Sequence, residues 1–391
     1  MKKTLILLLC LVLLTSASAC GKLQVNKERL EELLEIMDLR TFLQTVDLPD
    51  NFSIGFDAAD VKSVDSARIY KAVPLELDAN EVAEKLLKRE SVSTKVYAEG
   101  PYFETGDETF KEHLYVFDGG KSFGIDSGVV GGLSYSVVIN GERIRNKHGT
   151  VIRVAPGPPD DIIAQRWKYD LKSDYASFAD LSFMSYKDAL AAVEELLYDT
   201  LGFPELEVAE AYSMDLETML KHYELYKAAG GKEEITFSKD DECYVFFFRQ
   251  VIDGIPVVNI HWKDATFGET IPVTSVEVFY TKDGVRDIYA IDLLDIVEGG
   301  ENKPLISAAK ALQVVIDDYS EIILENETIV ESMELCYVGV KTEDGYYELI
   351  PAWVFRIVET VKFTNQADGN VYSYDSYSYY VVNAITGDRI E

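Results

Sequence analysis

Cysteine, histidine, tryptophan and basic residues are all scarce in this chain. Its 391 residues include four cysteines, four histidines and three tryptophans, and 37 Lys and Arg stand against 68 Asp and Glu, which gives a formal net charge of −31. Because Lys and Arg must neutralise the backbone of a nucleic acid, this deficit argues against a nucleic-acid partner. The acidic excess serves solubility or, alternatively, attracts Ca²⁺, Mg²⁺ or a basic partner.

The histidine and cysteine spacings of common metal sites are also missing. None of His113, His148, His222 and His261 stands in H-E-x-x-H spacing, and the sequence has no C-x-x-C pair. Zinc sites use ligands at such spacings, so we expect no metal site at these residues. Because no stretch of the sequence spells out a catalytic constellation either, we expect no cofactor and no enzyme activity.

Two short stretches resemble known binding loops without completing them. Residues 119–122 (GGKS) end like a phosphate-binding loop, but Tyr115 stands where the first glycine belongs, so we expect a hairpin turn. Residues 240–242 form the longest acidic run and lack the alternating ligands and central glycine of a calcium loop. We expect a solvated turn there, with calcium binding as the open alternative.

The one long apolar run lies at the N-terminus. Lys2 and Lys3 precede the uncharged, apolar residues 5–14, and small residues fill positions 15–19. Ten apolar residues are too few for a transmembrane helix, which needs about 20, whereas this arrangement is typical of a secretory signal. We expect residues 1–19 to be removed, which changes the formal charge from −31 to −33 because two lysines leave.

The residues before the expected cleavage point resemble the lipobox of bacterial lipoproteins. The sequence there is Ala17-Ser18-Ala19-Cys20, and the family prefers leucine at the position of Ala17. The resemblance implies that Cys20 carries lipid and that the exported protein is anchored to the outer face of the cytoplasmic membrane, since two or three acyl chains suffice for stable anchoring. The alternative is an ordinary signal peptide in which Cys20 is incidental.

Two cysteines remain once Cys10 leaves with the signal and Cys20 takes the lipid. These are Cys243 and Cys336. In an exported protein such a pair is a candidate disulfide, provided that the two Cα atoms approach within about 7 Å. The alternative is two buried thiols, because free cysteine packs as a small hydrophobe.

Length and composition indicate several domains. Residues 155–160 (APGPPD) are the strongest linker signal. Near the N-terminus, after a short tether that follows Cys20, we expect a helix that is capped by Asn26 and carries an apolar stripe to Leu43. The expected division is a signal peptide (1–19), a lipidated tether and helix (20–50), a strand-rich α+β domain (51–154), a linker (155–184) and two repeats (185–300 and 301–391).

The C-terminal half contains an internal repeat. Residues 185–193 and 307–315 both read S-x-x-x-A-L-x-x-V, a serine cap followed by one apolar helix face. Residues 242–262 and 334–355 each contain Cys-Tyr-Val, an Asp-Gly turn and a proline-containing apolar run, which predicts a β-hairpin. Each unit is then a helix followed by an antiparallel sheet, so the predicted fold class is α+β.

These two units resemble PepSY-like domains. Residues 245–257 resemble the aromatic strand, turn and G-[IV]-P-V strand of that family, and residues 349–353 and 380–387 resemble its L-x-P-A-W and V-x-A-x-T-G ending. The resemblance implies inhibitory or regulatory contact with an envelope peptidase or a sensor kinase. The whole chain, including residues 56–61 (FDAADV), is also similar to an uncharacterised family of clostridial lipoproteins, which implies no activity.

Tyrosines crowd one strand near the C-terminus. Strand alternation predicts Tyr372 and Tyr374 on one face and Tyr377 and Tyr379 on the other. Exposed tyrosines are rigid, amphipathic contact residues, so the strand is a candidate binding face for protein or glycan. The alternative is cross-strand packing within an aromatic-rich sheet.

We therefore expect a non-catalytic lipoprotein, anchored through Cys20, that binds or regulates another envelope protein. A solute- or glycan-binding surface lipoprotein is the alternative, and a hydrolase with an unrecognised site is the third hypothesis. Fold resemblance alone does not choose among them.

Overall fold

The chain is described here from a computed structural model. It describes residues 33–87, 92–101, 109–117, 121–127, 132–139, 142–144, 147–148, 175–228, 231–260, 262, 272–364 and 369–390. The expected signal segment, Cys20 and residues 155–174 of the expected linker lie outside these residues.

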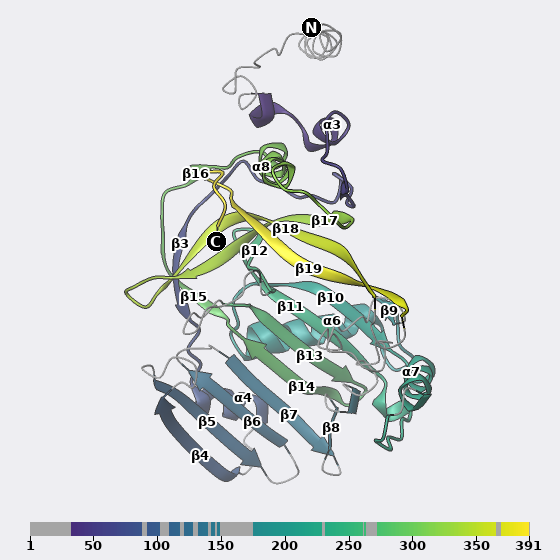
Figure 1. Ribbon diagram of the computed structural model, residues 1–391. Coiled ribbons are helices and arrows are strands. Elements are labelled where there is room, and N and C mark those ends of the chain that lie inside the picture. The colour runs from purple at the N-terminus through teal and green to yellow at the C-terminus, as the bar shows by residue number, and fades with distance from the viewer. Residues whose placement is uncertain are drawn as a thin grey trace, which may run out of the picture.

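A six-stranded sheet gathers strands from both ends of the described chain (Figure 1). In spatial order it contains β1 (Phe52–Ile54), β17 (Thr328–Lys341), β18 (Tyr347–Thr364), β3 (Tyr70–Pro74) and β15 (Leu294–Gly299). β17 pairs with one edge of β18. The last strand, β19 (Val371–Asn383), pairs with the opposite edge of β18, which it shares with β3. β1 is parallel to β17, and the other pairs are antiparallel.

A second, eleven-stranded sheet holds most of the remaining strands. Its order is β4 (Val92–Pro101), β5 (Thr109–Phe117), β6 (Lys121–Ser127), β7 (Gly132–Ile139), β14 (Gly284–Ile291), β13 (Ser275–Thr281), β11 (Cys243–Ile252), β10 (Leu206–Met214) and β9 (Ala176–Ser177), with β12 (Ile255–Pro256) paired to β11 and β8 (Glu142–Arg143) to β7. A two-stranded sheet pairs β2 (Ser66–Ala67) with β16 (Lys303–Pro304).

Helices cover both large sheets. α6 (Tyr186–Glu195), continued by a π-helical turn (Leu196–Thr200), packs Ala189 and Val193 against one face of the eleven-stranded sheet. α7 (Leu216–Ala228) places Met219 in a cluster on the opposite face, and α8 (Ala308–Ser320) packs on the six-stranded sheet. Other helices of the described residues include α3 (Leu39–Leu43), α4 (Ala79–Leu87) and a 3-10 turn (Lys239–Asp241).

The two large sheets meet at the β11–β12 hairpin. Its turn is Asp253-Gly254 with φ of 50° and 77°, and two positive φ angles are what a tight hairpin turn requires. β12 pairs with β11 over two residues, and then Val257 bridges to Tyr337 in the other sheet. The hairpin tip therefore contributes Ile252 and Ile255 to the core beneath α8.

The expected N-terminal helix differs from the structure. Within the described residues, the segment 33–36 is helical, Met37 and Asp38 interrupt it, and α3 begins a new helix. The reason is local: the Asp38 carboxylate accepts the Thr41 N–H at 3.0 Å, which holds Asp38 in an extended conformation as an N-cap. Leu34 is buried in the core shared with α8, as the apolar stripe predicts, and Phe42, which is not part of that stripe, is buried there too.

The predicted α+β class is confirmed. Both repeat hairpins and both serine-capped helices are present at the predicted residues. Strands from the expected domain 51–154 are divided between the two large sheets, and the domain limits and the duplication stay predictions. No helix in the described part of the chain is both long and apolar enough to span a membrane.

Candidate functional site

The tyrosine-rich strand β19 pairs with β18 over 13 residues without a register shift, from Ala352↔Asn383 to Thr364↔Val371. Because no bulge intervenes, the side chains alternate as predicted from the sequence. Tyr372 and Tyr374 lie on the face that carries Tyr380 and α8, and Tyr377 and Tyr379 lie on the other. The strand thus presents tyrosines in two directions.

The far half of this hairpin, residues 358–364 and 371–377, is called the aromatic ribbon below. Figure 1 shows β18 and β19 running away from α8 toward it. Phe363 is 37% exposed and stacks on Tyr372 at a centroid distance of 5.7 Å, with Tyr374 at 5.9 Å. Both tyrosines are half-buried. Stabilisation of the ribbon therefore comes from these cross-strand ring contacts.

On the opposite face of the hairpin the tyrosines meet charge. The Arg356 guanidinium lies over the Tyr377 ring, 4.6 Å from its centroid, and Arg356 Nε is 3.0 Å from a Glu331 carboxylate oxygen. Cation–π contact of this kind fixes both side chains. Tyr379 borders a cleft between the two large sheets.

This inter-sheet cleft has a volume of about 510 Å³. Its charged centre is Arg249 on β11, whose guanidinium bonds both Glu334 oxygens at 2.5 and 2.8 Å and a Glu207 oxygen at 2.6 Å. Burial alone would lower the pKa of Arg249, but the hydrogen bonds that it donates to Glu334 and Glu207, together with the charge of Glu334, outweigh burial and raise the pKa. Burial raises the pKa of Glu334, and the hydrogen bonds and the positive charge of Arg249 together reverse that shift and lower the pKa. The arginine is thus fully charged and ties the sheets together.

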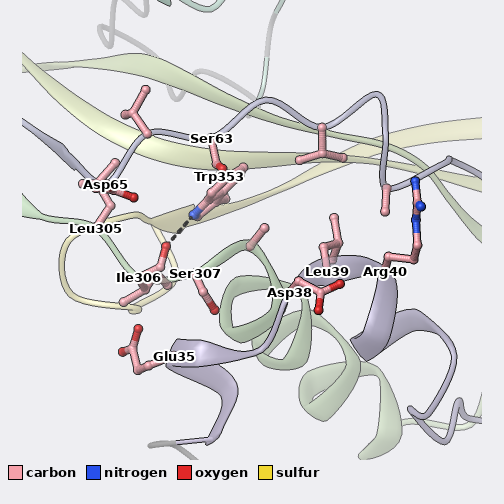
Figure 2. Close-up of a pocket in the computed structure, with 14 residues that line it drawn as sticks. Glu35, Asp38, Leu39, Arg40, Ser63, Asp65, Leu305, Ile306, Ser307 and Trp353 are labelled. Atoms are coloured by element: carbon pink, nitrogen blue, oxygen red, sulfur yellow. Dashed lines mark hydrogen bonds between the residues drawn. The ribbon is translucent and has the colours of Figure 1, made fainter. Parts of the chain in front are cut away.

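A second cavity, of about 530 Å³, lies between the N-terminal segment, the loop before β2 and the start of α8 (Figure 2). Two of its three carboxylates have protein partners: Glu35 pairs with Lys310 at 2.6 Å, and Asp38 caps α3. The side-chain and backbone hydrogen bonds from Thr41 lower the pKa of Asp38. Trp353 Nε1 donates to the Ile306 carbonyl at 3.3 Å at the back of the cavity. Glu35, Asp38 and Trp353 therefore have structural roles at this cavity.

The candidate disulfide between Cys243 and Cys336 is not formed in the structure. Both cysteines are free, buried thiols, and they belong to different clusters. Burial raises the pKa of each thiol. Cys243 Sγ lies 3.5 Å from Nε2 of the buried His148. Both thiols are protonated and inert at neutral pH.

The acidic run 240–242 lies in a turn, as its composition predicts, but only Asp240 is solvated. Asp241 and Glu242 are buried. Burial raises the pKa of Asp241, but the hydrogen bonds from Lys147, at 2.7 Å, and from Ser238, together with the charge of Lys147, outweigh this and lower the pKa. A Glu242 oxygen accepts the Leu216 N–H at 3.2 Å, which ties the start of α7 to β11. Within the described ranges, no group of three or more His, Cys, Asp or Glu side chains is placed to hold a metal.

Gly119 and Gly120, where the sequence predicts a hairpin turn, lie outside the described residues, and Lys121 and Ser122 begin β6, which pairs antiparallel with β5. Residues 120–124 (GKSFG) also match the G-x-S-x-G pattern of serine hydrolases. Ser122, however, lies inside β6 and pairs with Val116 and Ser136, whereas a nucleophile elbow is a sharp turn from strand to helix. The match therefore has no catalytic geometry.

Two contributors to the site were missed from the sequence. Arg249 and its neighbour Gln250 interrupt an otherwise apolar strand, CYVFFFRQVI, and a charge in such a strand signals a buried partner. Phe363 gives no such signal, because its role depends on the β18–β19 register. Cys20 lies outside the described residues, and its lipidation stays a prediction.

No protein-family model and no curated protein matches this chain. Among solved structures, it is similar to an uncharacterized protein from Eubacterium rectale, with a TM-score of 0.58, 17% identity and coverage of 94% of this chain and 99% of that one. It is also similar to the C-terminal domain of YpeB from Bacillus megaterium, with a TM-score of 0.28, 12% identity and coverage of 81% and 97%. The first similarity shows a shared fold alone, and the second carries no argument about function.

Proposed function

We propose that this protein is a non-catalytic, membrane-anchored extracytoplasmic lipoprotein that binds another envelope protein through the aromatic ribbon. In this proposal, lipid on Cys20 holds the protein at the outer face of the cytoplasmic membrane, and its body consists of PepSY-like units. An envelope peptidase or a sensor kinase is the class of partner that the PepSY-like resemblance favours.

The observation that carries the proposal is the composition and exposure of the strand 371–379 (VYSYDSYSY). It alternates tyrosine with serine, and its tyrosines are half-buried while Val371 is 69% exposed. Tyrosine with serine is the combination that dominates protein-binding loops of antibodies. The reason is physical: tyrosine supplies rigid contact area at low entropic cost, and serine adapts its hydrogen bonds to the partner.

The rings are also held in place before any partner arrives. Tyr372 and Tyr374 contact Phe363, and Tyr377 contacts Arg356. Side chains that are already ordered lose less conformational entropy on binding. This preorganisation supports a recognition surface.

The test is photo-cross-linking in intact cells. A benzophenone amino acid replaces Tyr374, and a matched variant carries it at Tyr289, a 37% exposed tyrosine on β14 in the other sheet. We expect one envelope protein to form an adduct at position 374 at least about ten times more strongly than at position 289, as expected for a central contact residue. Affinity capture and mass spectrometry identify the adduct.

The matching anchor control is Cys20→Ala in the Tyr374 variant. If lipid holds the protein beside its partner, this substitution abolishes the adduct and moves the protein from the detergent phase to the aqueous phase on Triton X-114 partitioning. A protein that stays in the detergent phase without Cys20 contradicts the anchor. Absence of an adduct at position 374 in the anchored protein contradicts ribbon binding and favours the solute- or glycan-binding alternative.

A further inference from the structure

One edge of β18 is open along its last residues. β17 pairs with β18 only as far as Glu359, whereas β19 continues to Thr364 on the other edge. No other strand of the described chain pairs with Val361–Thr364 on the β17 side. These residues belong to the aromatic ribbon, and Lys362, Phe363 and Thr364 are exposed.

The backbone direction at this edge follows from one hydrogen bond. The Thr360 N–H donates to the Glu327 carbonyl at 3.0 Å, so the polar groups of Thr360 point toward the β17 side. Alternate residues of an antiparallel strand point the same way, so the N–H and C=O groups of Lys362 and Thr364 also face the open edge. Those of Val361 and Phe363 face β19.

The open edge borders a groove of about 460 Å³. The groove lies between the start of β1, the loop before β17 and β18, and its polar lining includes Asn51, Ser53, Glu325, Glu327, Thr360 and Lys362. Backbone donors and acceptors beside a groove are the arrangement that receives an added strand in β-augmentation.

We propose that an extended segment of the partner protein adds to β18 at this edge, antiparallel and in line with β17. The inference rests on the proposed function and names the recognition mode for the same ribbon. Residues of the added strand that lie beside Phe363 extend the ring contacts of Tyr372 and Tyr374, so they are apolar or aromatic. Their alternating neighbours face Lys362, Glu325 and Glu327 and are polar.

The edge favours a different protein over a second copy of this chain. Symmetric antiparallel pairing of two such edges would place the two Lys362 side chains directly opposite or diagonal to one another on one face, and like charges across strands are destabilising. A lysine on an exposed edge is a common protection against self-association.

The experiment pans a display library of random twelve-residue peptides against the purified protein, residues 21–391, with counter-selection against Lys362→Pro. Proline removes the N–H that faces the groove and leaves the β18–β19 bonds intact, since proline is tolerated where the N–H faces solvent. Lys362→Ala is the matched control, because it removes the charge and keeps the N–H. Circular dichroism and the melting temperature check that each variant is folded.

We expect selected peptides to alternate apolar and polar residues and to bind Lys362→Pro about tenfold more weakly than Lys362→Ala, the effect of one lost hydrogen bond and of the strand distortion that proline adds. N-methylation of alternate amides in a selected peptide gives a second readout on the unaltered protein, and we expect it to abolish binding. A library that yields no peptide able to distinguish the parent from Lys362→Pro, or peptides that tolerate N-methylation at every position, overturns the inference. In that case a persisting adduct at position 374 would leave the proposed function standing.

Discussion

At the scale of single residues, the carboxylate of Asp292 gives the clearest dependence on pH. Asp292 lies where the chain leaves β14 for β15, and thus passes from the eleven-stranded to the six-stranded sheet. Burial raises the pKa of Asp292 to about 6, although the Val273 N–H donates to it at 2.9 Å. An unfolded aspartate has a pKa of about 3.9. The folded state therefore holds this proton more tightly than the unfolded state.

The sign of the stability effect follows directly. Below about pH 4, Asp292 is protonated in both states and does not lower the free energy of unfolding. As the pH rises to about 6, its ionisation lowers the free energy of unfolding by about 2 to 3 kcal/mol in total. Asp292→Asn keeps an acceptor for Val273 and tolerates the φ of 54°. We expect it to raise the free energy of unfolding at pH 7.5 by about 2 kcal/mol and to leave it unchanged at pH 4. Urea unfolding at both pH values measures the difference.

The control for that prediction is Asp283→Asn, on the exposed turn between β13 and β14. We expect no comparable gain at pH 7.5 from this variant. An equal gain from both substitutions would mean that reduced net charge, and not the burial of Asp292, is responsible.

At the scale of elements, the two serine-capped helices differ in what the cap does. Ser185 Oγ accepts the Asp188 N–H at 3.2 Å and bonds only within the first turn of α6. Ser307 Oγ accepts the Lys310 N–H at 3.0 Å and also donates to the Leu34 carbonyl at 2.6 Å, which fastens the N-terminal segment to α8. We expect Ser307→Ala to cost about 2 kcal/mol and Ser185→Ala about 1 kcal/mol in urea unfolding. Equal losses would show that the bond to Leu34 contributes nothing.

The elements that could be predicted from the sequence are those with local causes. The Asp253-Gly254 turn and the caps at Ser185 and Ser307 are fixed by residues within a few positions. Pairings such as β1 with β17 and β7 with β14 could not be predicted, because strands with similar apolar patterns compete and distant partners leave no local signal. The site shows the same difference between local and distant causes. The alternation of the four tyrosines could be predicted from their spacing, whereas the contact with Phe363 could not.

At the scale of the whole molecule, the two large sheets are joined by several independent contacts. The Gln250 side-chain amide makes two hydrogen bonds with the backbone of Leu294, at 2.7 and 2.9 Å, and so ties β11 to β15. The Tyr70 hydroxyl donates to Asp253, and Val258 N–H donates to the Tyr337 carbonyl at 2.9 Å. Because the hairpin tip also fills part of the core beneath α8, separating the sheets would expose apolar surface on both. We therefore expect the sheets to unfold together.

Arg249 tests this coupling, since it is 14% exposed and lies between a carboxylate of each sheet. Arg249→Met leaves Glu207 and Glu334 facing one another without a cation. Because these carboxylates are 36% and 46% exposed, solvent screens them, and we expect the substitution to cost about 1 to 2 kcal/mol. Adding Glu334→Gln removes one of the opposed charges and should recover part of the loss. In urea unfolding followed by tryptophan fluorescence and circular dichroism, we expect the parent and both variants to show one coincident transition. Two separate transitions in the parent would mean that the sheets are independent domains. The Arg249 substitution should then shift the two transitions only slightly, because each sheet would already be stable without the other.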